Sequence, residues 1–413
     1  MGYTILYPPT IDFDWLVQRP QQLMHAFASL GVRVFYMNPG IQAPHKRGVA
    51  RISKNLTILN KVDPKIYMKE RPIFYFSSPA HVDLIPRYNP SLVVFDYLDE
   101  PVEEFVSLAP YLHRALTSAD LVITSSERLY HDSLTVNPNT ILVPNGCDFD
   151  HFARAGHRSL AVPEDVKHLK PPIVGYHGAI ATWLNFDLIV RVAESLPHGH
   201  VVMVGPFYNL TSVPRRPNLH WLGYKPFEVL PNYTQLFDTA IIPFRVSQMT
   251  EAVNPIKMWE CMAAGIPVVT TALPEAQGIH EIYYSANDDE FIMNIRRALN
   301  EDPAQFRQAR VSLAQRNTWL ARARQILQAI ERTMGSAHRV SNASITGFRH
   351  NPLEIISPAF RRGRRIVIRV RSIAYERAPG IEVFRRSGIS LDLGSYTIRI
   401  KKPLVIPVQE RTI

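Results

Sequence analysis

Short apolar runs, rich in β-branched and aromatic residues, recur along the first 150 positions of the chain. They are TILYPP (4–9), VRVFYMN (32–38), PIFYFSS (72–78), LVVFDYL (92–98), LVITSS (121–126) and TILVPNG (140–146). Each run ends in polar, Gly or Pro residues, which is typical of strands buried on both faces of a parallel sheet. DWLVQRPQQLMHAFASLG, between the first two runs, has apolar residues at helical spacing and ends at Gly31, so a helix with a glycine C-cap is predicted there.

A second series of the same kind follows a polar, Pro-containing stretch near 155–171. Its runs are PIVGYHG (172–178), HVVMVGP (200–206), LHWLGY (219–224), TAIIPF (239–244) and IPVVTT (266–271). One or two amphipathic helices are predicted over 303–333. The pattern therefore predicts an α/β protein with two doubly wound, Rossmann-like domains, residues 1–165 and 166–333, whose strand ends face a shared cleft.

Hydropathy and cysteine content indicate the cellular compartment. Neither a run of ~18 apolar residues nor a basic N-terminus followed by an apolar segment is present in the sequence. Cys147 and Cys261 are far apart and offer no disulfide framework. A cytoplasmic protein is expected from these features.

The net charge of +10 lies entirely in the C-terminal part. Residues 336–413 hold fifteen Lys and Arg against five Asp and Glu, so the first 335 residues are neutral and a nucleic-acid-binding body is unlikely on this balance. RRGRR precedes two segments, 366–375 and 396–408, in which apolar residues alternate with Arg or Lys, and residues 334–413 are expected to form a basic, β-rich appendage. Three roles stay open: a solvated basic face, peripheral contact with anionic membrane lipids, or a nucleic-acid contact.

The segment TEAVNPIKMWECMAAGIPVV (250–269) carries the candidate chemistry. Asn254 at the N-cap, Pro255 at the first position and Gly265 at the end predict an eleven-residue helix. The positive end of such a helix is a site for phosphate.

Lys257 and Glu260 share one face of this helix. There the ammonium group suits a diphosphate leaving group and the carboxylate suits a ribose diol. Arg245, directly after the run TAIIPF, would add a second cation beside the same cleft. The alternative is an ordinary capped helix with an exposed Lys–Glu pair.

The stretch NPIKMWECMAAGIPVVTT resembles the donor-binding helix of family 4 (group 1) glycosyltransferases, which have the two-domain GT-B fold. Glu260 matches the second Glu of that family's Glu-x7-Glu motif, which implies contact with the donor ribose. The first Glu would fall at Ala252; Glu251 lies one place away, so either the register shifts or this contact is lost. The Asn-Pro-x-Lys variant resembles the teichuronic-acid branch, in which Lys257 would replace missing contacts.

Further resemblances to this branch extend to about residue 333. They include the Trp…Arg-Pro-Gln-Gln-Leu element with Trp15 and Arg19, and a strand that ends in Tyr-x-x-Asp at about Asp99. These three residues are assigned to the acceptor side of the cleft. His177 and Gly178 of VGYHGAIATWLNFDLI are assigned to the donor side, where a glycine lets backbone N–H groups approach phosphates. The loop from Ala179 to Asn185 lacks the cation that most family members have there, and Arg245 and Lys257 are the expected substitutes.

What the resemblance implies is a retaining transferase that acts in cell-envelope or exopolysaccharide synthesis. Its substrates would be a UDP or GDP sugar and a glycan or lipid-linked acceptor, with the departing phosphate taking the acceptor proton. No metal site and no cofactor are expected, because Asp288, Asp289 and Glu290 precede a helix and suit N-terminal charges. Two alternatives stay open: a degenerate, non-catalytic nucleotide-sugar or partner-binding protein, and a GT-B nucleotide-sugar epimerase.

Overall fold

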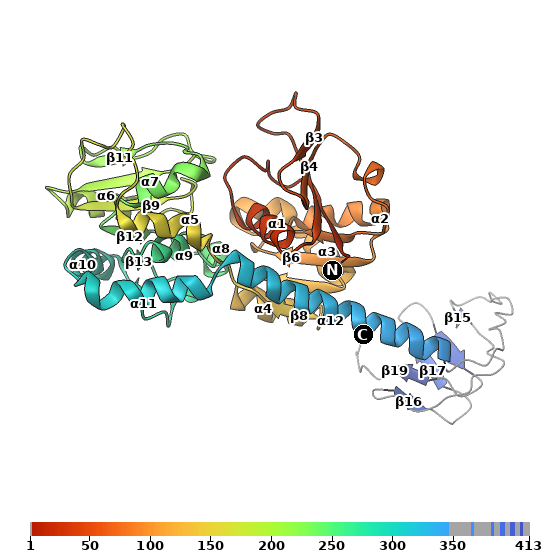
Figure 1. Cartoon of the computed structure of the whole chain (residues 1–413). Coiled ribbons are helices and arrows are strands. Elements are labelled where there is room, and N and C mark those ends of the chain that lie inside the picture. The colour runs from red at the N-terminus through yellow and green to blue at the C-terminus, as the bar shows by residue number, and fades with distance from the viewer. Residues whose placement is uncertain are drawn as a thin grey trace. The chain divides into compact units, whose positions relative to one another are not determined.

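The chain divides into two compact units, Met1–Met334 and Gly335–Ile413. The computed structural model describes residues 2–346 and the strand segments 365–366, 381–383, 389–392, 397–400 and 405–407. Figure 1 labels the helices and strands.

An eight-stranded sheet forms the core of the first domain. Its strand order is β3-β4-β2-β1-β5-β6-β7-β8, and its neighbours are parallel except for the antiparallel pair β3 and β4. The strands are β1 (Thr4–Tyr7), β2 (Arg33–Asn38), β3 (Gly48–Arg51), β4 (Leu56–Asn60), β5 (Ile73–Phe76), β6 (Leu92–Tyr97), β7 (Leu121–Thr124) and β8 (Thr140–Leu142). The helices of this part are α1 (Arg19–Ser29), α2 (Ile85–Tyr88), α3 (Ala109–Ser118) and α4 (Glu127–Leu134).

The start and end of α1 follow from its sequence. Gln18 caps the helix in a reciprocal capping box with Gln21, and Pro20 lies in the first turn, where its missing N–H costs no hydrogen bond. Gly31 has a φ of +88°, the left-handed conformation that ends helices. The predicted helix and its glycine C-cap are confirmed.

A six-stranded, wholly parallel sheet forms the second domain. Its order is β11-β10-β9-β12-β13-β14, so the direction of winding reverses between β9 and β12. The strands are β9 (Ile173–His177), β10 (His200–Val204), β11 (Leu219–Trp221), β12 (Thr239–Ile242), β13 (Val268–Thr270) and β14 (Tyr283–Tyr284). Its helices are α5 (Phe149–Ala153), α6 (Phe186–Glu194), α7 (Leu230–Thr234), α8 (Gln248–Glu251), α9 (Ile256–Ala263), α10 (Asp288–Leu299) and α11 (Pro303–Arg316). Two doubly wound domains, as predicted, are confirmed.

The cores of the two domains do not follow the expected residue boundaries. Phe152 of α5, counted with the first domain in the sequence analysis, is fully buried in the core of the second. The helix α12 (Trp319–Thr346), counted with the second domain, returns to the first and runs beside β8 (Figure 1), where Gln325 donates to the carbonyl of Leu142. Its Ile326 and Ile330 are fully buried in the core of the first domain.

The C-terminal unit contains five short strands among its described residues: β15 (Arg365–Ile366), β16 (Ile381–Val383), β17 (Ile389–Asp392), β18 (Thr397–Ile400) and β19 (Val405–Pro407). The last two lie within the predicted strand region 396–408. Most of residues 366–375 lie outside the described residues, so the basic β appendage stays a prediction. No helix in the described part of the chain is long and apolar enough to cross a membrane.

Candidate functional site

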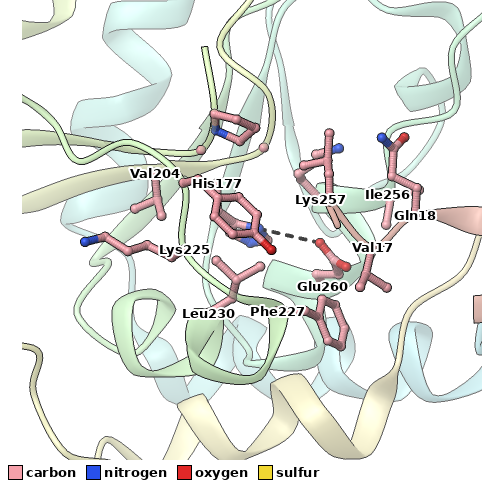
Figure 2. Close-up of a pocket in the computed structure, with 15 residues that line it drawn as sticks. Val17, Gln18, His177, Val204, Lys225, Phe227, Leu230, Ile256, Lys257 and Glu260 are labelled. Atoms are coloured by element: carbon pink, nitrogen blue, oxygen red, sulfur yellow. Dashed lines mark ion pairs between the residues drawn. The ribbon is translucent and has the colours of Figure 1, made fainter. Parts of the chain in front are cut away.

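A cavity of about 510 Å³, open mouth included, lies at the carboxyl ends of β9 and β10. The first turn of α9 lines it from the second domain, and Leu16, Val17 and Gln18 line it from the first. Parallel sheets bind ligands where their winding reverses, which is here. We call this space the Glu260 cavity (Figure 2).

The helix α9 is shorter than the predicted eleven residues, because it begins after Pro255 rather than at it and already ends at Ala263. Pro255 is the N-cap residue, and the helix runs for eight residues. The Asn254 side chain does not cap it; its amide donates to Glu275 (3.0 Å) and accepts from the indole N–H of Trp259 (3.0 Å). Gly265 has a φ of +74° and ends the helix as predicted. Asn254 and Pro255 thus shape the start of α9 from buried positions.

Glu260 lies at the bottom of the cavity and is only 5% exposed. Its carboxylate points toward His177 (Figure 2), with 3.6 Å between Oε2 and Nδ1. Burial raises the pKa of Glu260 to about 7; Asp148 adds to this rise and Lys257 opposes it. Burial, together with Lys257 and His151, lowers the pKa of His177 to about 3, so the imidazole is neutral and this contact joins a carboxyl group to an uncharged ring.

Lys257 lines the same cavity one turn before Glu260, so the structure brings this predicted pair together. Burial lowers the pKa of the Lys257 ammonium, whereas Glu260 and Asp99 favour its charged form. Gly178, also in the wall, has a φ of +147°, and a Cβ there would come within 2.5 Å of Lys257 Cε. Its own N–H is bonded to the carbonyl of Val204 (2.8 Å), so Gly178 admits the lysine side chain and does not itself offer a free donor.

Replacing Glu260 with Gln is expected to stabilise the unliganded protein above neutral pH. The folded-state pKa of about 7 exceeds the ordinary value of 4.5, so the native state holds its proton longer than the unfolded state. Between these values the free energy of unfolding falls as pH rises. Thermal unfolding should therefore show a midpoint difference, variant minus wild type, that grows from about pH 5 to about pH 8. The exposed Glu228→Gln is the control; a flat difference for Glu260→Gln would contradict the expectation.

Arg245 does not line the Glu260 cavity. It lies at the carboxyl end of β12 in a second cavity of about 690 Å³, open mouth included, with Trp183, Thr182, Glu103 and Glu104. The prediction that Arg245 and Lys257 flank one diphosphate is therefore not supported by this arrangement. We call this second space the Arg245 cavity.

Glu251 is part of a contact between the domains. Its carboxylate pairs with Arg128 of the first domain (2.6 Å), and Arg128 also pairs with Glu100 (3.1 Å). Ala252, the position expected for the family's first Glu, is fully buried in the core of the first domain. A one-residue register shift does not bring Glu251 to the Glu260 cavity.

The three residues assigned to the acceptor side have different surroundings. Trp15 stacks on Tyr224 of the second domain, with 4.1 Å between ring centroids, so it contacts the other domain. Arg19 is buried at 2% exposure and does not face the cleft. The side chain of Asp99 is exposed to solvent, but protein atoms lie on most sides of it. Desolvation of the carboxylate by these atoms raises the pKa of Asp99 to about 6, and Lys257 and Arg19 oppose the rise.

Several residues of the Glu260 cavity were missed in the sequence analysis. Tyr224, Lys225 and Phe227 follow β11, and Lys225 pairs with Asp165 (2.7 Å). Their only signal was their place after a parallel strand. Leu16 adopts a φ of +42°, which is rare for leucine, and no sequence pattern marks it.

Among the described residues, no group of three or more His, Cys, Asp or Glu side chains has metal-binding geometry. The Asp288–Glu290 cluster opens α10, with Asn287 as its cap.

Two sequence comparisons bear on this architecture. Residues 171–301 match the model of the family described as glycosyl transferases group 1. The chain is also 25% identical over 301 residues to a protein of Bacillus subtilis (strain 168) assigned as the teichuronic acid biosynthesis glycosyltransferase TuaH, covering 66% of this chain and 75% of that protein.

Solved structures share the fold. Sucrose-phosphate synthase from Thermosynechococcus elongatus aligns with a TM-score of 0.63 at 18% identity over 81% of this chain and all of that one. Anabaena HepE in complex with UDP and glucose aligns with a TM-score of 0.60 at 12% identity over 80% of this chain and all of that one. In sequence the chain is thus similar to group 1 glycosyltransferases over residues 171–301, and its two facing doubly wound domains have the GT-B fold of these solved structures.

Proposed function

We propose that the chain transfers a sugar from a nucleoside-diphosphate donor to an acceptor hydroxyl, with retention of anomeric configuration, in the synthesis of a cell-envelope or exopolysaccharide glycan. One observation carries the donor side of this proposal: Lys257 and Glu260 of α9 line one cavity at the winding reversal of a parallel sheet. The structures of HepE were obtained with UDP, glucose and UDP-glucose, which supports a donor of this class.

Within the Glu260 cavity, each group has a distinct task. The Glu260 carboxylate accepts hydrogen bonds from the ribose hydroxyls, and the Lys257 ammonium neutralises the diphosphate as negative charge grows on it. The first turn of α9 directs backbone N–H groups toward the same phosphates. The departing phosphate takes the acceptor proton, and neither a protein base nor a bound metal ion is required in this scheme.

Two other parts of the proposal concern the surroundings of the enzyme. A teichuronic acid relative supports an acceptor from the cell envelope, glycan or lipid-linked. The basic residues after position 334 would bring a cytoplasmic enzyme to the anionic surface of the membrane where such acceptors lie.

Calorimetric titration of the full-length protein with UDP and with GDP tests the donor site. One of the two nucleotides should bind the wild type, and Glu260→Ala should weaken that binding by about tenfold or more, because a charge-assisted hydrogen bond is lost. Glu228→Ala, an exposed substitution, should leave it unchanged. Equal binding to Glu260→Ala and wild type would rule out this ribose contact, and no binding of either nucleotide would remove the proposal's main support.

Analysis of the reaction products distinguishes the transferase from the two alternative functions. An epimerase would convert the donor sugar without an acceptor, and a non-catalytic relative would bind the nucleotide without turnover in a competent acceptor extract. The presence of Lys257 and Glu260 in the wall of one cavity favours the transferase over the non-catalytic hypothesis.

A further inference from the structure

The Arg245 cavity is formed by both domains, and it shares no lining residue with the Glu260 cavity. It still lies at the same edge of the second sheet, since the loop after β9 supplies Gly178 to one cavity and Thr182 and Trp183 to the other. The adjacent strand β12 ends at Ile242, three residues before Arg245. The two cavities are therefore next to each other along the carboxyl edge of the sheet.

The wall from the second domain is held rigidly. The Arg245 N–H donates to the carbonyl of Trp183 (2.8 Å), and Leu184 and Phe244 form an antiparallel bridge. The ring of Tyr208 lies beside the indole of Trp183, at 6.0 Å between centroids. The backbone at Trp183 and Arg245 is thus fixed, and the indole and the guanidinium group both belong to this side of the cavity.

The wall from the first domain carries two carboxylates. Glu104 accepts hydrogen bonds from the Thr182 hydroxyl and from the amide of Asn209 (3.0 Å), so it joins the domains. Glu103 accepts from the Met249 N–H (3.3 Å) through one oxygen. Its φ of +47° is a strained conformation, and such strain in a glutamate concentrates at functional positions.

The chemistry of this cavity fits a polyhydroxylated ring. Carboxylate oxygens accept hydrogen bonds from hydroxyl groups, guanidinium N–H groups donate to hydroxyl or ring oxygens, and an indole face covers an apolar ring face. Two carboxylates against one guanidinium leave a net negative cavity, which disfavours an anionic ligand.

We propose that the Arg245 cavity is the acceptor subsite and that it takes a neutral pyranose ring stacked on Trp183, with hydroxyls bonded to Glu103 and Arg245. This assignment rests on the proposed transferase function, because it makes the neighbouring Glu260 cavity the donor side. Arg245 then contributes to acceptor binding and not to the diphosphate.

Saturation-transfer NMR on the full-length protein tests the proposal with methyl β-D-glucopyranoside and glucuronate as probes. The glucoside should receive saturation on its C–H protons, Trp183→Leu should abolish the transfer, and Arg245→Gln should weaken binding by about tenfold. Glucuronate should bind less well than the glucoside. Arg216→Gln, an exposed arginine paired with Glu194, is the matched control and should bind like the wild type.

A second measurement separates the two cavities. Arg245→Gln should bind UDP or GDP within about threefold of the wild type, whereas Lys257→Ala should lose about tenfold or more. The subsite proposal is overturned if the glucoside gives no transfer, if transfer persists in both cavity variants, if glucuronate binds better, or if Arg245→Gln weakens nucleotide binding as Lys257→Ala does. If no nucleotide binds the wild type while the glucoside still requires Trp183, the donor function fails and the saccharide site stands.

Discussion

Lys257→Ala is expected to slow release of the nucleoside diphosphate from a bound donor by about 100- to 1,000-fold, the usual loss when one preorganised donor to a developing charge is removed. Lys257 lies in the wall of the Glu260 cavity, where burial lowers its pKa and two carboxyl groups oppose that effect. A bound diphosphate would further stabilise the positive charge of the Lys257 ammonium group. Single-turnover assays of donor cleavage, with the donor class fixed by titration, provide the measurement.

Lys225→Ala is the matched control for this experiment. It removes the same charge from the same cavity, but Lys225 already pairs with Asp165 at 2.7 Å and lies over the ring of Tyr233. We expect a loss below about tenfold, because its charge is already compensated. Equal losses in the two variants would show that Lys257 acts only through the net charge of the cavity.

Arg19→Leu is expected to lower the free energy of unfolding by about 3–5 kcal/mol, because it leaves a buried carboxylate without its partner. Arg19 and Asp96 are 2% and 1% exposed, and the guanidinium donates to Asp96 through Nε (3.0 Å) and Nη2 (2.8 Å). It also donates to the carbonyl of Val143 (2.8 Å) and to Asn145 (3.1 Å). Denaturant unfolding followed by circular dichroism measures the loss.

Arg33→Leu supplies the comparison for Arg19→Leu. Arg33 pairs with Glu70 at 3.1 Å, but both side chains are about half exposed, so this pair should contribute no more than about 1 kcal/mol. Adding Asp96→Leu to Arg19→Leu should recover part of the stability, since the unpaired charge is then removed. A loss for Arg19→Leu no larger than that for Arg33→Leu would contradict the expectation.

Arg19 is also connected to the start of α9, through Asn145. Asn145, one of its acceptors, donates through its own amide to the backbone carbonyl of Asn254 (2.6 Å), just before α9. The arginine that resembled an acceptor contact is therefore a structural link between the core of the first domain and the start of α9.

Most of the fold was predictable because fully buried parallel strands leave continuous apolar runs. Every run identified in the first 334 residues coincides with a strand. Three strands were missed, β3, β4 and β14. The strand β4 is itself a buried run, LTILN, so burial does not distinguish it from the predicted strands. In β3 burial is incomplete and Val49 is 44% exposed, whereas β14 has only two residues, so neither leaves a clear run.

The candidate site was predictable only where its residues share one local element. Lys257 and Glu260 are three apart on a helix, so their common face follows from helical geometry. Arg245 and Arg19 depend on distant partners instead. Two cavities lie along the edge of the second sheet, and no sequence pattern near Arg245 indicates which of them it lines. The ion-pair partner of Arg19, Asp96, is 77 positions away in the sequence.

The return of α12 to the first domain has a consequence for synthesis of the chain. When residues 1–165 have been synthesised, every strand of the first sheet is present. The part of α12 that packs in the same core as Ile5 and Val34 is still missing, because Ile326 and Ile330 come later in the sequence. The domain that emerges first is thus completed last, after the whole second domain has left the exit tunnel. During that interval its uncovered apolar face is a target for chaperones.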